Sequence, residues 1–394
     1  MHSVEAAAKS VAERITVLPS EAVPIREALG RFAAVDLIAA RSLPSFDNSA
    51  MDGYAVRHAE LPGTFTIVGA VGAGAGVIAV PPGHVARILT GAPMPAELDT
   101  VVIQEDAEVD GDSVKLPSEK RFENVRTVGE DIATGQVAVP AGTRLRAGEL
   151  GLCAALGMAQ IQCGRAPRVA IIATGDELVD VAAELGPSQI VDSSAHTIPA
   201  LVRDAGGIPT YIGIAKDDPI ETRRIIESAL GYDVVITTGG VSVGDRDHVR
   251  GALAAAGVEL ELYKVAMKPG KPFSFGKRGD IVVFGLPGNP VSSYVAFELF
   301  VRPALLAMQR AAVIQRPRVP VSLANGYKKN AGRTHFLRAT VVRHGERLIA
   351  TPHPKQGSAI LSSLVGCNAL VECPAEMTEI PSTQVVSAIM LEPV

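Results

Sequence analysis

Two hydrophobic patterns follow one another along this chain of 394 residues. Beyond Arg168, short apolar runs are each followed by a glycine-containing loop and then by a segment with helical spacing. The runs are RVAIIATGDEL, GGIPTYIGIAKDD, DVVITTGGVSVGD and DIVVFGLPGNP. Strands that are apolar throughout and alternate with helices are typical of a parallel sheet covered on both faces. This pattern predicts a central parallel α/β domain.

The segments on either side of this domain have a different pattern. Residues 1–35 have helical spacing that ends in a strand-like RFAAVDLIA, and helical spacing returns in AGELGLCAALGM at 147–158. Between them, short runs such as FTIVGAV and TVVIQED are separated by Gly and Pro, which predicts a β-rich domain. From about Pro317 the chain returns to β-like runs. The fold class is therefore multidomain α/β plus β.

Composition narrows the class of protein. A chain that is 47% hydrophobic and 20% charged can form several cores, since domains usually hold about 100 to 200 residues. A net charge of −5 argues against a general nucleic-acid surface, and we see neither a signal peptide nor a membrane span. Cys153, Cys163, Cys367 and Cys373 form no CxxC pair. We expect a cytoplasmic protein with reduced thiols, and no nucleic-acid or membrane partner.

The loops after three of the strands carry the candidate chemistry, because ligands of open parallel sheets bind beyond the carboxyl ends of the strands. Each loop combines glycine with hydroxyl, carboxylate or amide groups. Glycine lets backbone N–H groups approach an anion, and a following helix adds its positive end, so we predict a phosphate site. A plain strand-to-helix connection is the alternative. The predicted binding residues are Thr174, Gly175, Gly239, Gly240, Ser242, Gly244, Pro287, Gly288, Asn289, Pro290 and Ser292.

Carboxylates project from the same predicted edge. Asp176 and Glu177 follow the first strand, and Asp245 and Asp247 lie in the second loop. Acidic groups beside an anion site would repel the ligand unless a hard cation such as Mg²⁺ bridges them. We therefore predict that these four residues hold a metal. The alternative is that they cap helix N-termini, as acidic residues often do.

Three lysines lie close together in the segment YKVAMKPGKPFSFG. Lys264, Lys268 and Lys271 fall within eight residues, and two prolines restrict the chain around the last two. Lysines usually lie on solvated surfaces, but this rigid spacing before an apolar strand also favours the binding of an oxyanion.

Six strings in the chain together resemble one known family. They are SLPSFDNSAMDGYAV, RILTGAPMP, NVRTVGEDI, TTGGVSVGDRDHV, MKPGKPFSFG and GLPGNPVSS, and they occur in the family's order over nearly the whole chain. The chain is similar to molybdopterin molybdenumtransferases of the MoeA type, a family that includes the carboxyl-terminal domain of gephyrin.

The resemblance implies an activity and a domain layout. The expected activity inserts molybdate into adenylylated molybdopterin, releases AMP and depends on a divalent cation, usually Mg²⁺. The expected assembly is an elongated homodimer. The expected domains are an elongated linker domain (1–40 with 136–166), a β-rich domain (41–135), the α/β molybdopterin-binding domain (167–312) and a C-terminal β-barrel domain (313–394).

The resemblance also carries roles onto particular residues. Its essential positions match Asp52, Thr90 and Asp131 in the β-rich part, and Glu177, Asp217, Asp247, Lys264 and Lys268 in the α/β part. A molybdate pocket is expected from Lys268, Lys271, Ser292, Arg333 and Ser358. Lysine, arginine and hydroxyl donors around an oxyanion are sound electrostatics.

Two other functions stay open from the sequence. A molybdopterin adenylyltransferase shares the α/β domain but is a single short domain, so the length of this chain argues against it. A non-catalytic dimeric scaffold would be expected to lack the acidic residues or the basic pocket, which are present here. Since no adenylyltransferase domain is fused to this chain, we expect a separate molybdopterin adenylyltransferase to supply the substrate.

Overall fold

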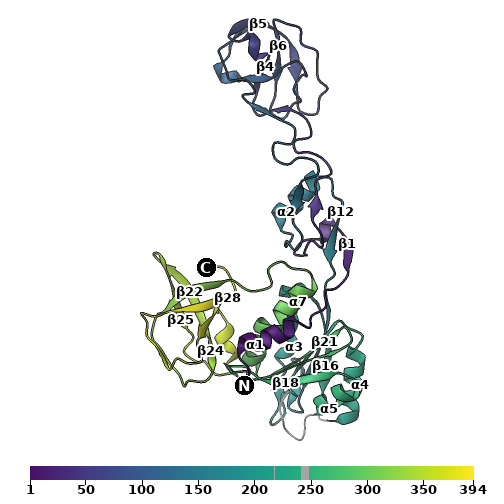
Figure 1. The fold of residues 1–394 in the computed structure, drawn as a ribbon, viewed down its shortest axis with the longest axis vertical. Helices are drawn as coiled ribbons and strands as arrows, with labels where there is room; N and C mark the ends of the chain where they lie inside the picture. Colours follow the sequence, from purple (N-terminus) through teal and green to yellow (C-terminus); the bar gives the residue numbers. More distant parts are fainter. Residues whose placement is uncertain (217, 241–247) are drawn as a thin grey trace.

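The computed structural model describes residues 1–216, 218–240 and 248–394, which form four units in an elongated molecule (Figure 1). A β-rich unit lies at one end and is joined through a narrow elongated unit to the rest. At the other end an α/β unit and a C-terminal barrel lie side by side. The chain starts and finishes at this second end.

The α/β unit is built on a six-stranded sheet of order β16-β13-β17-β21-β20-β18. The first four strands are parallel, as the sequence predicts, but β20 runs antiparallel to both of its neighbours. The sheet is therefore mixed, because β20 and β21 are joined by a short turn instead of a crossover helix. The strands are β13 (Arg168–Thr174), β16 (Ile208–Ala215), β17 (Val234–Thr238), β18 (Glu259–Lys264), β20 (Pro272–Arg278) and β21 (Ile281–Leu286).

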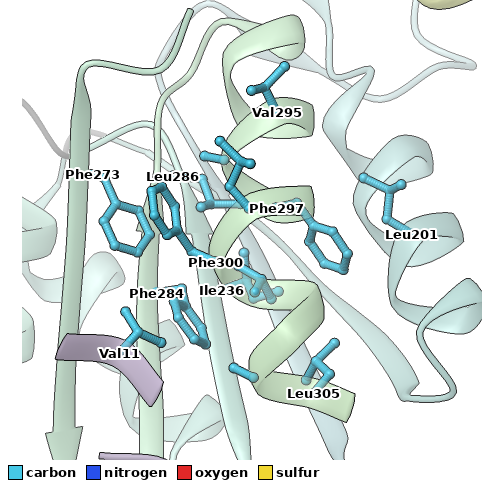
Figure 2. Packing of buried hydrophobic residues seen from close by; sticks show 14 of the residues in the cluster. Val11, Leu201, Ile236, Phe273, Phe284, Leu286, Val295, Phe297, Phe300 and Leu305 are labelled. Carbon is cyan, nitrogen blue, oxygen red and sulfur yellow. The ribbon is translucent and has the colours of Figure 1, made fainter. Parts of the chain in front are cut away.

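Helices cover both faces of this sheet, as its continuous apolar strands require. One apolar core joins the sheet to α1, α3 and the long helix after β21, and a second joins it to α4 and α5. Figure 2 shows the first core, where the ring centroids of Phe273 and Phe300 are 4.5 Å apart. The helices are α1 (Val4–Ala12), α3 (Ser194–Asp204), α4 (Pro219–Ala229), α5 (His248–Ala255), α6 (Pro290–Ala296) and α7 (Arg302–Met308).

The helix after β21 is continuous from Pro290 to Met308, with a wider turn at Phe297–Val301 between α6 and α7. By length and composition it would be able to cross a membrane. Most of it is buried in the protein core, including Val295, Phe297 and Leu305. Its apolar character is therefore explained by packing inside the α/β unit.

The elongated unit corrects one expectation. Residues 1–35 do not form one helix, because α1 ends at Ala12 and the chain then enters β1. Val4, Ala7 and Val11 of α1 pack in the α/β core. The domain boundaries expected from the sequence remain a prediction. The unit contains β1 (Ser20–Pro24) paired with β12 (Gln160–Gly164), β2 (Leu37–Ile38) paired with β11 (Val137–Val139), and α2 (Ala147–Ala155).

The β-rich unit is a six-stranded sheet of order β7-β4-β6-β5-β9-β8, with an apolar cluster on each face. Its strands are β4 (Gly53–Val56), β5 (Gly63–Val71), β6 (His84–Ile88), β7 (Thr100–Ile103), β8 (Glu108–Asp110) and β9 (Ser113–Leu116). A short pair, β3 (Asn48–Ser49) with β10 (Val125–Arg126), lies beside it.

The C-terminal unit is a closed barrel of five strands in the order β24-β25-β22-β28-β26, closed by the pairing of β26 with β24. The strands are β22 (Arg318–Leu323), β24 (Thr334–His344), β25 (Arg347–Pro352), β26 (Ala369–Cys373) and β28 (Val385–Met390), and β23 (Tyr327–Lys328) pairs with β27 (Glu379–Ile380) beside them. A further short strand from the α/β unit, β19 (Met267–Lys268), pairs with β24 and joins the two units.

Candidate functional site

Three loops meet at the carboxyl edge of the α/β sheet. Thr174 donates a hydrogen bond through Oγ1 to the carbonyl oxygen of Thr238 at 3.1 Å. Gly239 donates its N–H to the carbonyl oxygen of Leu286 at 3.0 Å. A Cβ atom on Gly288 would lie 3.6 Å from the Cα of Gly239. The loops after β13, β17 and β21 therefore pack against each other at the edge where the sequence placed them.

Glycine is required where these loops touch. Gly239 and Gly240 have φ angles of +84° and +62°, a conformation that residues with a side chain rarely adopt. A Cβ on Gly239 would lie 2.6 Å from Oγ1 of Thr174. Without side chains, the backbone of this turn stays accessible to a ligand, as an anion-binding loop needs.

The loop after β13, which carries Asp176 and Glu177, is held by hydrogen bonds from Lys216. The Lys216 ammonium donates to the carbonyl oxygens of Leu178 at 2.9 Å and Asp176 at 3.3 Å. A Cβ on Gly175 would lie 2.6 Å from Oε2 of Glu177, so this carboxylate lies over Gly175. Asp176 and Glu177 are both exposed at the sheet edge.

The lysine loop lies at the same edge. Lys264 ends β18, and Lys271 precedes β20, whose first residues lie beside the carboxyl end of β21. The loop is closed by a hydrogen bond of 3.0 Å from the N–H of Val265 to the carbonyl oxygen of Lys271. Lys264, Lys268 and Lys271 are exposed. Three strand spacings separate β13 from β20, so this part of the edge spans about 14 Å.

The barrel brings further cations to the lysine loop. Lys268 pairs in register with His335 of β24, and the N–H of Thr334 donates to the carbonyl oxygen of Ala266 at 2.9 Å. Lys329 donates to the carbonyl oxygen of Arg333 at 3.1 Å and so holds the loop that carries this arginine. His335 is 5% exposed. Burial, with repulsion from Lys268, Lys329 and Arg333, lowers the pKa of His335 to about 4.

The segments that carry Ser292 and Ser358 contact one another. The N–H of Val291, next to Ser292, donates to the carbonyl oxygen of Ser358 at 3.1 Å. A Cβ on Gly270 of the lysine loop would lie 3.5 Å from the carbonyl oxygen of Ser292. The side chain of Ser292 is nearly buried, while Asn289 and Gly288 are exposed. The residues expected to hold molybdate thus come from neighbouring segments of two units.

Asp52 and Thr90 form a separate pair in the β-rich unit. Oδ1 of Asp52 accepts hydrogen bonds from the N–H of Thr90 at 2.7 Å and from its hydroxyl at 2.8 Å. These two bonds, the backbone one first, lower the pKa of Asp52. Among the described residues, no hydrogen bond or ion pair joins Asp131 to this pair. In Figure 1 the β-rich unit lies at the opposite end of the molecule from the α/β sheet.

Several predicted positions fall outside the described residues. They are the acidic residues Asp217, Asp245 and Asp247 and the loop residues Ser242 and Gly244. Within the described ranges there is no group of three or more His, Cys, Asp and Glu side chains that would hold a metal ion.

Some residues that shape this site were not among those predicted from the sequence. Arg338 is 1% exposed, and it donates to Oγ of Ser363 at 3.0 Å and to the carbonyl oxygen of Gly357 at 3.1 Å. It therefore holds the segment that carries Ser358. An arginine inside the apolar run HFLRATVV was the available signal. Lys216 and Lys329 carry no comparable signal, because lysines in loops are common.

Three family models match this chain in order. The MoeA N-terminal region (domain I and II) matches residues 2–157, the probable molybdopterin binding domain matches 170–307, and the MoeA C-terminal region (domain IV) matches 320–391.

Known proteins are similar over almost the full length. A molybdopterin molybdenumtransferase of Haemophilus influenzae is 35% identical, with 93% of each chain covered. One of Bacillus subtilis is 33% identical over 94% of this chain and 90% of its own. The crystal structure of a molybdopterin biosynthesis MoeA protein from Pyrococcus horikoshii OT3 has a TM-score of 0.86 at 29% identity, covering 99% of this chain and 100% of that one.

Proposed function

The chain belongs to the MoeA family of molybdopterin molybdenumtransferases, and we propose from this premise that it inserts molybdate into adenylylated molybdopterin with release of AMP. It is thus a transferase of molybdenum cofactor biosynthesis. Adenylyltransferase activity is not favoured, because the similarity extends through the regions on both sides of the molybdopterin-binding domain.

One observation carries the proposal. Glycine loops suited to phosphate groups and a loop rich in lysine share the carboxyl edge of a single sheet, and the loop after β13 lies three strand spacings, about 14 Å, from β20. An adenylylated pterin is long and carries its phosphates in the middle, so it needs an extended site of this kind. Molybdate is a separate oxyanion, which needs cations of its own.

Within this proposal, the lysine end of the edge binds molybdate. Lys268, Lys271 and Arg333 supply charge-assisted hydrogen bonds, and the hydroxyls of Ser292 and Ser358 complete the donor set. The neutral state of His335 matters here, because its lowered pKa keeps it from adding a further charge behind Lys268. Thr174, Gly175, Gly239, Gly240 and the segment Pro287–Pro290 bind the phosphates at the other end.

Mg²⁺ is part of the proposal, and the available donors fit it. Asp176 and Glu177 present exposed carboxylates beside the phosphate loops. Mg²⁺ typically uses one or two carboxylates together with substrate phosphates and waters, so a group of three protein ligands is not needed. When bound, the ion would neutralise phosphate charge. Asp245 and Asp247 stay as predicted further ligands, outside the described residues.

We also propose a homodimer in the cytoplasm. The β-rich unit, which carries Asp52 and Thr90, lies at the far end of the molecule from the α/β sheet, so one chain does not bring this pair to its own lysines (Figure 1). A two-fold dimer would bring the β-rich unit of one copy to the α/β unit of the other. The four cysteines are free thiols, which suits a reducing compartment. A separate molybdopterin adenylyltransferase would supply the substrate.

A turnover assay tests the activity. Purified protein is incubated with adenylylated molybdopterin, molybdate and Mg²⁺, and free AMP and active cofactor are measured. We expect both products, and a large loss of both for Lys268→Gln but not for Arg224→Ala, an exposed arginine on α4. ATP consumption with unmodified molybdopterin would instead indicate an adenylyltransferase, and absence of any turnover would favour a scaffold.

Mixed dimers test the shared site. Asp52→Asn and Lys268→Gln chains are each expected to be inactive alone. Mixed at equal amounts and allowed to exchange, they should recover roughly one quarter of wild-type turnover, because half of the dimers carry one intact site of two. No recovery after demonstrated exchange would contradict a site built from two chains.

A further inference from the structure

A cavity of about 390 Å³ lies where three parts of the chain meet, away from the candidate site. It is lined by the elongated unit, by the end of α3 with the start of α7, and by the segment that leads to the barrel. Since α3 ends just before β16 begins, this is the amino edge of the sheet, opposite the carboxyl edge that carries the candidate site. The lining includes Phe32, Arg144, Asp204, Arg302, Val313 and Arg316.

Arg316 is fully engaged by protein groups. Its guanidinium donates to both carboxylate oxygens of Glu298 at 2.8 and 3.1 Å, and to Asp204 at 2.9 Å. It also donates to the carbonyl oxygen of Leu391 at 2.6 Å. The side chain of Glu298 is 1% exposed. The two acidic groups near the cavity are thus already committed to Arg316.

Arg302 is in the opposite situation. Its side chain is 12% exposed, and its Nε atom lies 3.9 Å from both Asp204 and Glu298, too far for hydrogen bonds. Within the described parts of the chain, its Nε is buried without a hydrogen-bond partner. Burial, followed by repulsion from Arg316, lowers the pKa of Arg302. A guanidinium has five N–H donors, and leaving one of them buried without an acceptor is costly.

Arg144 adds a second cation to the same cavity. It pairs with Phe32 through an isolated bridge in the elongated unit, and the described residues offer it no ion pair. The rest of the lining includes the apolar side chains of Phe32, Leu306 and Val313 and the polar side chains of Thr143 and Gln315. The volume exceeds what an inorganic ion needs and falls within the usual range for small-molecule sites of about 300 to 1,000 Å³.

We propose that this cavity binds a small organic anion, a phosphate ester or a carboxylate, through Arg302 and Arg144, with its apolar part against Phe32 and Leu306. The charged group supplies acceptors to the guanidinium of Arg302, which Asp204 and Glu298 approach only to 3.9 Å. Because the walls come from three parts of the chain, the bound ligand contacts all three. The site is independent of the molybdate transfer proposed above.

Calorimetric titration at constant ionic strength tests the proposal with three probes. They are 4-bromophenyl phosphate, 4-bromobenzoate and the neutral 4-bromobenzyl alcohol, each titrated into the full-length protein. We expect at least one anion to bind and the alcohol not to bind, and the anion that binds tells phosphate from carboxylate ligands. Arg144→Ala and Arg302→Gln should each weaken binding by about tenfold, as for the loss of a charge-assisted hydrogen bond. Arg224→Ala should leave it unchanged.

Crystals soaked in the anion that binds locate the site, because bromine gives an anomalous signal. A peak in the cavity beside Phe32 is expected for the wild type, and a weaker one for Arg144→Ala at the same ligand concentration. Arg144 is exposed, so its replacement is not expected to disturb folding. The Arg144→Ala variant therefore still tests the proposal if Arg302→Gln does not fold. Absence of binding by either anion, equal affinity in all variants, or bromine only at the carboxyl edge of the sheet would overturn the proposal.

Discussion

Replacement of Gly239 by alanine tests how the three loops of the candidate site are packed. The change forces a side chain onto a residue with φ of +84°, which costs about 1–2 kcal/mol. The new Cβ would lie 2.6 Å from Oγ1 of Thr174 and 2.8 Å from its carbonyl oxygen. Overpacking of this kind costs typically about 1–3 kcal/mol, so we expect Gly239→Ala to destabilise the α/β unit by about 2–5 kcal/mol.

Gly257→Ala is the matched control for the backbone strain alone. Gly257 lies in the same unit with φ of +76°, and the atom nearest to a Cβ there is 4.0 Å away. Its replacement should cost only the strain, about 1–2 kcal/mol. Differential scanning calorimetry compares both variants on the transition of the α/β unit, where 1 kcal/mol corresponds to roughly 4 °C for a domain of this size.

The double variant Thr174→Ala with Gly239→Ala separates the two contacts. It removes the hydroxyl and leaves the carbonyl oxygen, so part of the stability lost by Gly239→Ala should return, as expected for residues in direct contact. Equal melting temperatures for Gly239→Ala and Gly257→Ala would refute the close approach of the loops. So would strict additivity in the double variant.

Three further outcomes follow from the structure. Arg338→Met should destabilise the barrel by about 2–4 kcal/mol, because it leaves Gly357 and Ser363 without their buried donor. Limited proteolysis should then cut the chain near Ser358. An unchanged melting temperature and cleavage pattern would show that Arg338 is dispensable. His335 binds a proton less readily in the folded protein (pKa about 4) than when unfolded (about 6.5), so stability falls as pH drops from about 6.5 to 4, by up to about 3 kcal/mol. His335→Gln should lose this part of the pH dependence in calorimetric scans, and a parallel pH profile would contradict it. Thr90→Val keeps the backbone donor to Asp52 but removes the hydroxyl, so the pKa of Asp52 should rise in an NMR titration of its carboxyl carbon, and no change would show that the hydroxyl bond does not form in solution.

Local sequence predicted the α/β unit well, because its signals are local. Apolar strands followed by glycine and a helix identify β13, β17 and β21, and the order of strand, loop and helix places their loops at one edge. The same logic failed for residues 13–35, where helical spacing predicted a continuation of the first helix. There the strand β1 forms because β12, far along the chain, offers it a partner.

The tertiary structure alone joined the lysine loop to the barrel. Lys268 of β19 and His335 of β24 are paired neighbours, but no pattern in the sequence predicts this pairing. A short strand of two residues has almost no periodicity of its own, and its pairing depends on how two units dock. The environment of Arg302 also depends on the tertiary structure. Arg316 forms hydrogen bonds with both nearby carboxylates, Glu298 and Asp204, and no sequence pattern predicts this.

By itself, the sequence determined the kinds of group available: glycine turns, a lysine loop, an Asp52 and a Thr90 in a β-rich segment, and the family to which these motifs point. Only the tertiary structure decided which of these groups meet: it joined Asp52 to Thr90 and placed their β-rich unit at the far end of the molecule from the α/β unit. The physical reason is range. Periodicity and turn chemistry act over a few residues, whereas a binding site is assembled by packing between segments hundreds of residues apart.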